Sequence, residues 1–283
     1  MRKNILDVII KPKVWYTKKE GIMSNKLIKL YKVENFTDNR NTLVIITHGI
    51  AEHLGRYDYF TSKLNESGLS VLRYDLRGHG KSEGKKGYVK SFKFFIDDLH
   101  ALVLEYKSQF KNIFLFGHSM GGEIVNLYSA TYHDVKGIVS SAASVDTPAS
   151  AAILKIIPYK LIGFIKQKTS FGNTLCSNPD VVKAYQEDPL VLPYFYGRLA
   201  GEMFINAIRY IKRNTHLMNT PILFIHGAED KVVSPSFSKD LYDKIKIDEK
   251  RIIIYHNARH EVLNEYCKDI VIKDVIDWIK ENE

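Results

Sequence analysis

The sequence has little cysteine, and this scarcity excludes two kinds of stabilising site. Only two of its 283 residues are cysteines, Cys176 and Cys267. Two cysteines are too few for a disulfide framework, and these two lie too far apart for the spacing of metal ligands. We therefore expect no structural metal and a reducing, cytoplasmic location.

Targeting signals and long apolar runs are also missing. The apolar stretch from Ile5 to Ile10 is short, contains Asp7 and lacks a small-residue cleavage site, so no signal peptide is predicted. Every later apolar stretch is interrupted by lysine or aspartate before the roughly 20 residues needed to cross a bilayer. We expect no transmembrane helix, and the sequence contains no internal repeat or low-complexity segment.

The charge of the chain is strongly positive, with a formal net value of +9. The lysines are scattered and gather only in short pairs such as Lys18-Lys19 and Lys85-Lys86, which is typical of a solvated, lysine-rich surface. A peripheral contact with an anionic membrane is the alternative. Nucleic acid is not an expected partner, because the aromatic residues lie in apolar periodic segments and form no binding motif.

Apolar, β-rich runs alternate with helical patterns along most of the chain. This alternation predicts an α/β protein with a mostly parallel, doubly wound sheet and helices on both faces. Core strands are expected at residues 43–47, 69–74, 112–116, 137–141, 221–226 and 251–256, with antiparallel edge strands possible within 26–36. Helices are expected at 92–110, 120–132, 236–245 and 270–279.

The alternation breaks between Val145 and Thr220, a gap too long for an ordinary crossover connection. We therefore divide one catalytic domain into a core, at 1–145 and 220–283, and an inserted helical cap at 146–219. The first part of the cap, residues 149–168, is apolar with lysines spaced through it, and Pro158 should break or kink it. Two interpretations stay open: a helix packed on the core, and a lid that lines a lipid pocket or dips into a membrane interface.

The segment Gly117 to Gly121, of sequence GHSMG, is the first chemical signal. The pattern G-x-S-x-G alone is weak, since about one chain in ten of this length would contain it by chance. Here it follows an expected strand and opens an expected helix, which is the arrangement of a nucleophile elbow. Such a sharp turn needs the two flanking glycines, and the helix directs its positive N-terminal end at the serine. Ser119 is therefore the predicted nucleophile.

A serine hydroxyl needs a base to remove its proton and a carboxylate to orient that base. In chains with this elbow, the acid and then the histidine follow the serine. Asp230 lies in the loop after the strand expected at 221–226, and His260 lies in the loop after the strand expected at 251–256. They are the predicted acid and base, with Glu229 and His256 as their rivals. Four histidines that precede or adjoin the serine are expected to have structural or pocket-shaping roles: His48, His53, His79 and His118.

Two N–H groups must hold the negative oxygen that develops on a substrate carbonyl. One donor usually belongs to the residue after the nucleophile, here Met120, and the other to the loop after an early strand. The loop that follows residues 43–47 predicts Ile50 as this second donor. Such a site needs no metal ion and no organic cofactor.

Further motifs surround these residues. They are HGIAEH at 48–53 with Arg56-Tyr57, DLRGHGKSEG at 75–84, Gly122 after the elbow, Asp188-Pro189-Leu190, and the loops that hold Asp230 and His260. Together, over most of residues 40–280, they resemble the monoacylglycerol lipase and lysophospholipase branch of the α/β-hydrolases, of the serine aminopeptidase S33 type. The resemblance implies an enzyme that cleaves carboxylic esters of single-chain lipids, with the insertion as a cap over the acyl tunnel.

The resemblance also implies roles for individual residues. Glu52 and Arg56 match positions suited to shaping the glycerol end of the pocket. Ile50 stands where relatives more often have a small residue, which predicts a narrower pocket beside the oxyanion hole. A carboxylesterase for small soluble esters and a non-catalytic lipid-binding protein on the same scaffold are the alternatives. Chain-length preference and oligomeric state stay open.

Overall fold

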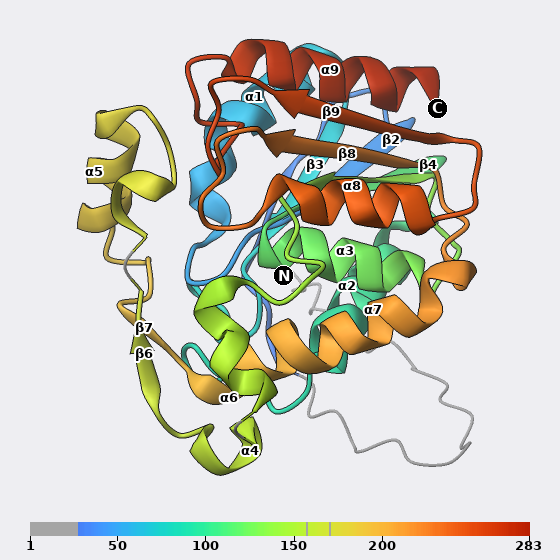
Figure 1. Cartoon of the computed structure of the whole chain (residues 1–283). Coiled ribbons are helices and arrows are strands. Elements are labelled where there is room, and N and C mark those ends of the chain that lie inside the picture. The colour runs from blue at the N-terminus through green and yellow to red at the C-terminus, as the bar shows by residue number, and fades with distance from the viewer. Residues whose placement is uncertain (1–27, 157, 170) are drawn as a thin grey trace, which may run out of the picture.

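A seven-stranded sheet forms the centre of the structure, a computed structural model that describes residues 28–156, 158–169 and 171–283 (Figure 1). The strand order is β1-β3-β2-β4-β5-β8-β9. The strands are β1 Lys32–Asn35, β2 Thr42–Thr47, β3 Ser70–Tyr74, β4 Asn112–His118, β5 Gly137–Ser141, β8 Ile222–Gly227 and β9 Lys250–Tyr255. Strand β1 pairs antiparallel with β3, and every other neighbouring pair is parallel. The predicted, mostly parallel sheet is confirmed.

Helices cover both faces of this sheet (Figure 1). Alternate residues of each strand point to opposite faces, so Val44 and Ile46 pack with one cluster of buried residues while Leu43 and Ile45 pack with the other. The first cluster includes residues of α1 Asp58–Glu66 and α9 Lys268–Glu281, and the second includes residues of α2 Lys93–Tyr106, α3 Met120–Ser129 and α8 Pro235–Lys244. Burial on both faces explains why the strands read as continuous apolar runs.

The predicted elements differ from the observed ones mainly at their ends. Helices α2 and α3 end at Tyr106 and Ser129, earlier than predicted. The predicted helices were too long because Phe110 and Tyr132, which lie beyond the observed helices, still pack against the core and continue the apolar pattern. One antiparallel edge strand, β1, lies in the predicted 26–36 region. Residues 26–27 and the segment weighed as a signal peptide lie outside the described residues.

The segment between β5 and β8 begins with short elements and ends with a continuous helical stretch from Gly197 to Asn214 (Figure 1). Its elements are η2 Ala149–Lys155, α4 Tyr159–Ile162, the strand pair β6 Lys166–Lys168 and β7 Tyr194–Tyr196, η3 Gly172–Thr174, α5 Pro179–Glu187, α6 Gly197–Gly201, the π-helical η4 Glu202–Ala207, α7 Ile208–Asn214 and η5 Thr215–Leu217.

The interpretation of residues 149–168 as one helix packed on the core is wrong. A seven-residue 3-10 helix, a four-residue α-helix and strand β6 stand there instead, and Pro158 occupies the N-cap of the α-helix. The ring of Pro158 cannot continue a helix from the preceding turn. No helix within the described part of the chain is both long and apolar enough to cross a membrane.

Candidate active site

Ser119 stands in a strained turn between β4 and α3. Its backbone has φ 53° and ψ −116°, a conformation that a non-glycine residue rarely adopts. A Cβ atom at Gly117 would lie 2.2 Å from the Gly121 carbonyl oxygen, and one at Gly121 would lie 2.1 Å from the Thr47 carbonyl oxygen. Neither glycine can therefore be replaced without moving the backbone, and the turn holds Ser119 at the N-terminus of α3.

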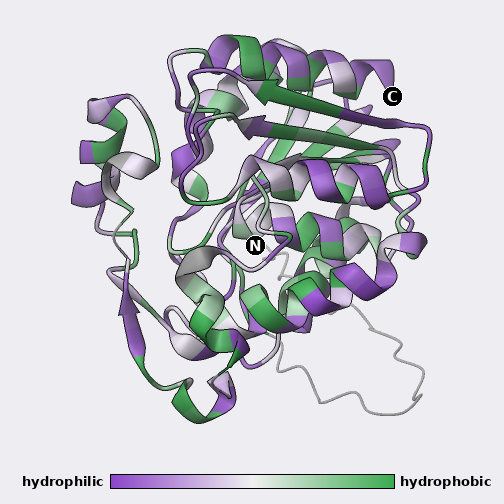
Figure 2. Cartoon of the chain, viewed as in Figure 1, coloured by the Kyte–Doolittle hydropathy of each residue, from purple (hydrophilic) through white to green (hydrophobic). Residues whose placement is uncertain are grey.

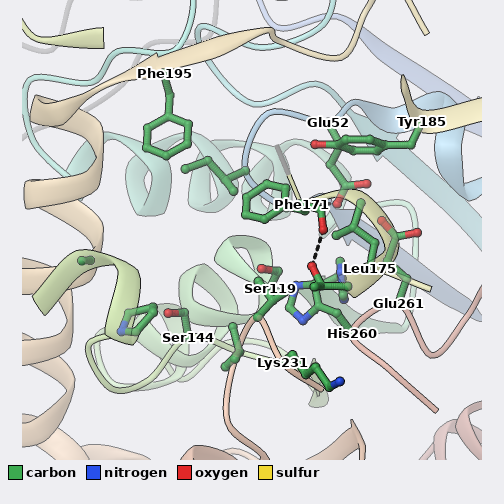
Figure 3. A pocket seen from close by; sticks show the side chains of 18 of the residues that line it. Glu52, Ser119, Ser144, Phe171, Leu175, Tyr185, Phe195, Lys231, His260 and Glu261 are labelled. Carbon is green, nitrogen blue, oxygen red and sulfur yellow. Dashed lines mark hydrogen bonds between the residues drawn. The ribbon is translucent and has the colours of Figure 1, made fainter. Parts of the chain in front are cut away.

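Asp230 and His260 meet across two loops that leave the same edge of the sheet. Strands β8 and β9 are parallel, so the loops after them lie together. The Nδ1 atom of His260 donates to Oδ2 of Asp230 at 2.7 Å, and Oδ1 of Asp230 accepts from the N–H groups of Val232 and Val233 at 2.8 and 2.9 Å. His260 and Ser119 face the same cavity (Figure 3). With Nδ1 protonated, the neutral ring keeps its lone pair on Nε2.

The rival residues occupy different surroundings. Asp230 is only 8% exposed and His260 only 3%, whereas Glu229 and His256 are exposed. Since an acid and a base that orient one another work best away from water, the geometry favours Asp230 and His260.

The pKa values of this pair move in opposite directions. Burial by itself raises the pKa of Asp230 and lowers the pKa of His260. Their mutual attraction and hydrogen bond outweigh burial, so the pKa of Asp230 falls well below its usual range and the pKa of His260 rises above 6.5. Asp230 is thus a carboxylate at neutral pH, and it stabilises the protonated form of His260.

His226 is a contact of Asp230 that sequence reasoning missed. Its Nε2 atom lies 3.0 Å from Oδ2 of Asp230, and its Nδ1 atom lies 2.8 Å from Oγ of Ser238. The ring is fully buried. Nε2–H therefore donates to the carboxylate and Nδ1 accepts from the serine hydroxyl. The sequence feature that could have identified this contact is a histidine at the end of an expected strand, four residues before the predicted acid.

The loop after β2 passes beside the nucleophile. A Cβ atom at Gly49 would lie 3.3 Å from Cβ of Ser119, and both Gly49 and Ile50 line the cavity. The Gly49 N–H donates to Oε1 of Glu52 at 2.5 Å, whereas the N–H of Ile50 has no acceptor among the described residues. Ala51 next to it has φ 64°, so the loop is held in a strained form.

Glu52 and Arg56 belong to a buried ionic cluster at the cavity wall. Nη1 of Arg56 lies 2.9 Å from Oε2 of Glu52, and both Nη atoms bind the Glu261 carboxylate, at 2.6 and 2.8 Å. Tyr57 donates its hydroxyl to Oε1 of Glu52 at 2.9 Å. Burial raises the pKa of Glu52, but Arg56, two nearby histidines and the Gly49 N–H together outweigh burial, and the pKa falls to about 2. Glu261, the residue directly after His260, was not predicted.

The four other histidines all lie close to this region. His118 lines the cavity, with its ring centroid 4.8 Å from that of His260, and burial lowers its pKa to about 4. His48 and His79 are fully buried, with ring centroids 5.4 Å apart, and His48 accepts the N–H of Leu76. These three rings are neutral packing groups of the loops around Ser119. His53 contacts the segment between β5 and β8.

The cavity has a volume of about 320 Å³ and is mostly apolar away from Ser119. Figure 3 shows Phe171, Leu175 and Phe195 among the side chains that line it. Its apolar lining consists of Ile50, Pro148, Ala151, Phe171, Leu175, Phe195, Phe204, Val232 and Val233. Most of these residues come from the segment between β5 and β8. Within the described residues, no group of three or more histidine, cysteine, aspartate or glutamate side chains could hold a metal ion.

Known proteins share this sequence pattern and this fold. A family model described as "Serine aminopeptidase, S33" matches residues 38–266. The chain is 30% identical to a monoacylglycerol lipase of Mycolicibacterium smegmatis, over 86% of this chain and 89% of that one. It is 29% identical to a monoglyceride lipase of Rattus norvegicus, over 84% and 82% of the two chains.

A solved structure is similar over the same range. The crystal structure of a monoacylglycerol lipase from Paleococcus ferrophilus matches with a TM-score of 0.83 and 27% identity, covering 90% of this chain and 100% of that one. Together these similarities confirm the predicted α/β-hydrolase fold and the predicted branch of it.

Proposed function

Since the chain belongs to the serine aminopeptidase S33 family of α/β-hydrolases, we propose that Ser119, His260 and Asp230 are the catalytic triad of a lipase for monoacylglycerols. The family and the similarity to monoacylglycerol lipases together support a carboxylic ester hydrolase. One observation carries the triad: the hydrogen-bonded His260–Asp230 pair faces the same cavity as the strained Ser119.

The reaction proceeds by two acyl transfers. Oγ of Ser119 attacks the ester carbonyl while Nε2 of His260 takes its proton, and the protonated His260 then gives that proton to the departing alcohol. Water repeats the sequence on the acyl-enzyme and releases the fatty acid. Asp230 stabilises the protonated His260 in both halves, in agreement with the opposite pKa shifts of the pair.

The N–H groups of Met120 and Ile50 are the proposed oxyanion donors. Met120 is the first residue of α3, and Ile50 lines the cavity with an N–H that has no acceptor among the described residues. These features support donors on two sides of the carbonyl oxygen. The side chain of Ile50 narrows the space beside this oxygen, and Glu52 and Arg56 shape the wall at the alcohol end.

Residues 146–219 act as the cap of the proposed enzyme, over a core formed by 1–145 and 220–283. The apolar walls that this segment contributes support an acyl-chain substrate, because a hydrocarbon tail gains roughly 0.8 kcal/mol for each buried CH₂ group. Similarity to proteins named as monoacylglycerol and monoglyceride lipases supports the same substrate class.

The outer surface of the cap supports contact with an anionic membrane. Five large apolar side chains are exposed there, at 51–81%: Ile153, Ile156, Leu161, Phe164 and Ile165. Exposed lysines lie among them, at positions 155, 160, 166 and 168. Figure 2 shows this mixture of hydrophobic and hydrophilic residues over α4 and its surroundings. Apolar side chains between lysines fit the boundary between anionic headgroups and acyl chains, which would deliver substrate to the cavity.

A hydrolysis panel with Ser119→Ala tests the proposed function. Wild type should hydrolyse monoacylglycerols faster than short p-nitrophenyl esters, and Ser119→Ala should abolish both activities. Ser108→Ala, which changes an exposed serine outside the cavity, is the control. Full activity of Ser119→Ala would overturn the triad. Hydrolysis of short esters alone would make the protein a carboxylesterase, and folded wild type that neither hydrolyses nor reacts with a fluorophosphonate probe would be a binding protein.

A further inference from the structure

The Asp188-Pro189-Leu190 motif lies in the cap, yet it contacts the loop beside the nucleophile. Oδ2 of Asp188 lies 2.7 Å from Nε2 of His53, a residue 135 positions away in the chain. The His53 side chain is 9% exposed and the Asp188 side chain 25%, so water screens the contact only in part. Neither residue lines the cavity.

Hydrogen bonds fix both partners of this contact. Nδ1 of His53 accepts the N–H of Gly55 at 3.1 Å, so the hydrogen of the neutral ring is on Nε2 and is donated to Asp188. The second oxygen of Asp188, Oδ1, accepts the N–H of Leu190 at 2.8 Å. Neither side chain can rotate without losing a hydrogen bond to the backbone.

A second contact joins the cap to the same loop. The N–H of Leu192 donates to the carbonyl oxygen of Ala51 at 2.8 Å. Ala51 has φ 64°, a left-handed conformation that is unfavourable for a non-glycine residue. Residues 51 and 53 thus both form hydrogen bonds with the cap, and Ile50 directly precedes Ala51. The surroundings, rather than local preference, keep this loop in its strained form.

We propose that Asp188 is a positioning residue for the oxyanion hole: through His53 it fixes the loop that presents the Ile50 N–H to the substrate. This inference rests on the proposed function. The cap then does more than cover the acyl chain, because its contact with His53 also sets the position of a donor in the core. A donor displaced by about 1 Å loses most of its benefit in the transition state, while the binding of the acyl chain is unaffected.

Asp188→Asn is the first test. His53 and Leu190 donate to different oxygens of Asp188, and the amide replaces one of these oxygens by an NH₂ group that cannot accept, so one of the two hydrogen bonds is lost. With active sites titrated, we expect kcat on a short p-nitrophenyl ester to fall by roughly tenfold to a hundredfold, with KM changed less than about threefold. A merely structural role would lower the melting temperature or the titratable fraction and leave kcat per active site unchanged, which would overturn the proposal.

Two substitutions of His53 form a matched pair. Glutamine places an N–H near the position of Nε2 and can still donate to Asp188, whereas asparagine places an oxygen near Nδ1 and can satisfy only Gly55. His53→Gln should therefore keep kcat within about threefold of wild type. In His53→Asn, kcat should fall by the same factor as in Asp188→Asn. In the double variant of Asp188→Asn and His53→Asn the two losses of kcat should not add, because both substitutions remove the same hydrogen bond. Equal activity of the two His53 variants, or additive losses, would contradict the proposal.

Asp134→Asn is the control for the loss of an aspartate of similar exposure. Its side chain is 20% exposed and contacts His100 and Tyr128 away from the cavity. This variant should keep kcat unchanged. An active wild type with an equally active Asp188→Asn variant overturns the positioning role alone. A wild type without esterase activity overturns the proposed function.

Discussion

The sheet core and the segment between β5 and β8 are held together in different ways. In the core, strands β2 to β5 and β8 are buried along their whole length, and the longest helices, α2 and α9, have 14 residues each. In the inserted segment, α6, η4 and α7 form one continuous helical stretch from Gly197 to Asn214, but the elements before it are short, and the longest of them among the described residues is the nine-residue α5. It also leaves six large apolar side chains exposed among its described residues, the five on the outer cap and Leu217.

This difference separates chemistry from substrate selection. Ser119, Asp230 and His260 stand on loops of a close-packed core, where a displacement of one loop would disturb buried neighbours. The inserted segment contributes the apolar cavity walls, and short elements can change there without disturbing the sheet. We therefore expect substitutions in the core to affect turnover and stability, and substitutions on the outer cap to affect access to lipid.

Asp230→Asn should have the largest effect. The amide cannot stabilise protonated His260, so we expect kcat to fall by about 10³- to 10⁴-fold on a short p-nitrophenyl ester, with the fold intact. Glu229→Gln changes the exposed neighbouring carboxylate and should leave kcat unaltered. If the Glu229 variant lost the activity instead, the acid would have to be reassigned.

Arg56→Met should destabilise the core strongly. It leaves the buried carboxylates of Glu52 and Glu261 without their cation, which should lower the free energy of unfolding by about 3–5 kcal/mol in urea titrations. Arg251→Met breaks an ion pair with Glu281 whose side chains are about half exposed, and should cost less than about 1 kcal/mol. Similar losses of unfolding free energy in the two variants would mean that burial of the Arg56 ionic cluster does not increase its contribution to stability.

The pH dependence of kcat/KM should report the raised pKa of His260. The base must be neutral, so kcat/KM should fall as the pH is lowered through a midpoint above 6.5. Without the Asp230 carboxylate, burial dominates and the pKa of His260 drops, so the residual activity of Asp230→Asn should persist to lower pH than that of wild type. A midpoint that stayed in place in this variant would assign the titration to another group.

The smallest effect on catalysis is expected from the outer cap. The double variant of Leu161→Ser and Phe164→Ser should leave hydrolysis of a dissolved short ester within about twofold of wild type, because neither side chain lines the cavity. Its sedimentation with anionic vesicles, and its hydrolysis of monoacylglycerol in them, should decrease. Ile270→Ser, at a 62% exposed position on α9, is the control. Equal vesicle binding by all three proteins would contradict membrane contact through the cap.

Sequence patterns were sufficient where the structure depends on neighbours in the chain. The glycines around Ser119 and the apolar run before it specify a strand, a sharp turn and a helix, because steric limits on the backbone act locally. Ser119, Asp230 and His260 could be grouped because parallel strands place the loops at their carboxyl ends along one edge of the sheet. The interpretation of residues 149–168 as a helix packed on the core was wrong, because the exposed apolar residues there have the composition of a buried helix.

The sequence by itself thus determined the fold class, the family and the residues proposed for the chemistry. Only the tertiary structure decided which side chains hold these residues in place. Glu261 on Arg56 and Asp188 on His53 are polar contacts between separate elements, and His226 at the end of β8 contacts Asp230 in the loop that follows. A polar side chain has the same local signature whether it binds water or a distant partner, and its environment is settled only when the chain packs.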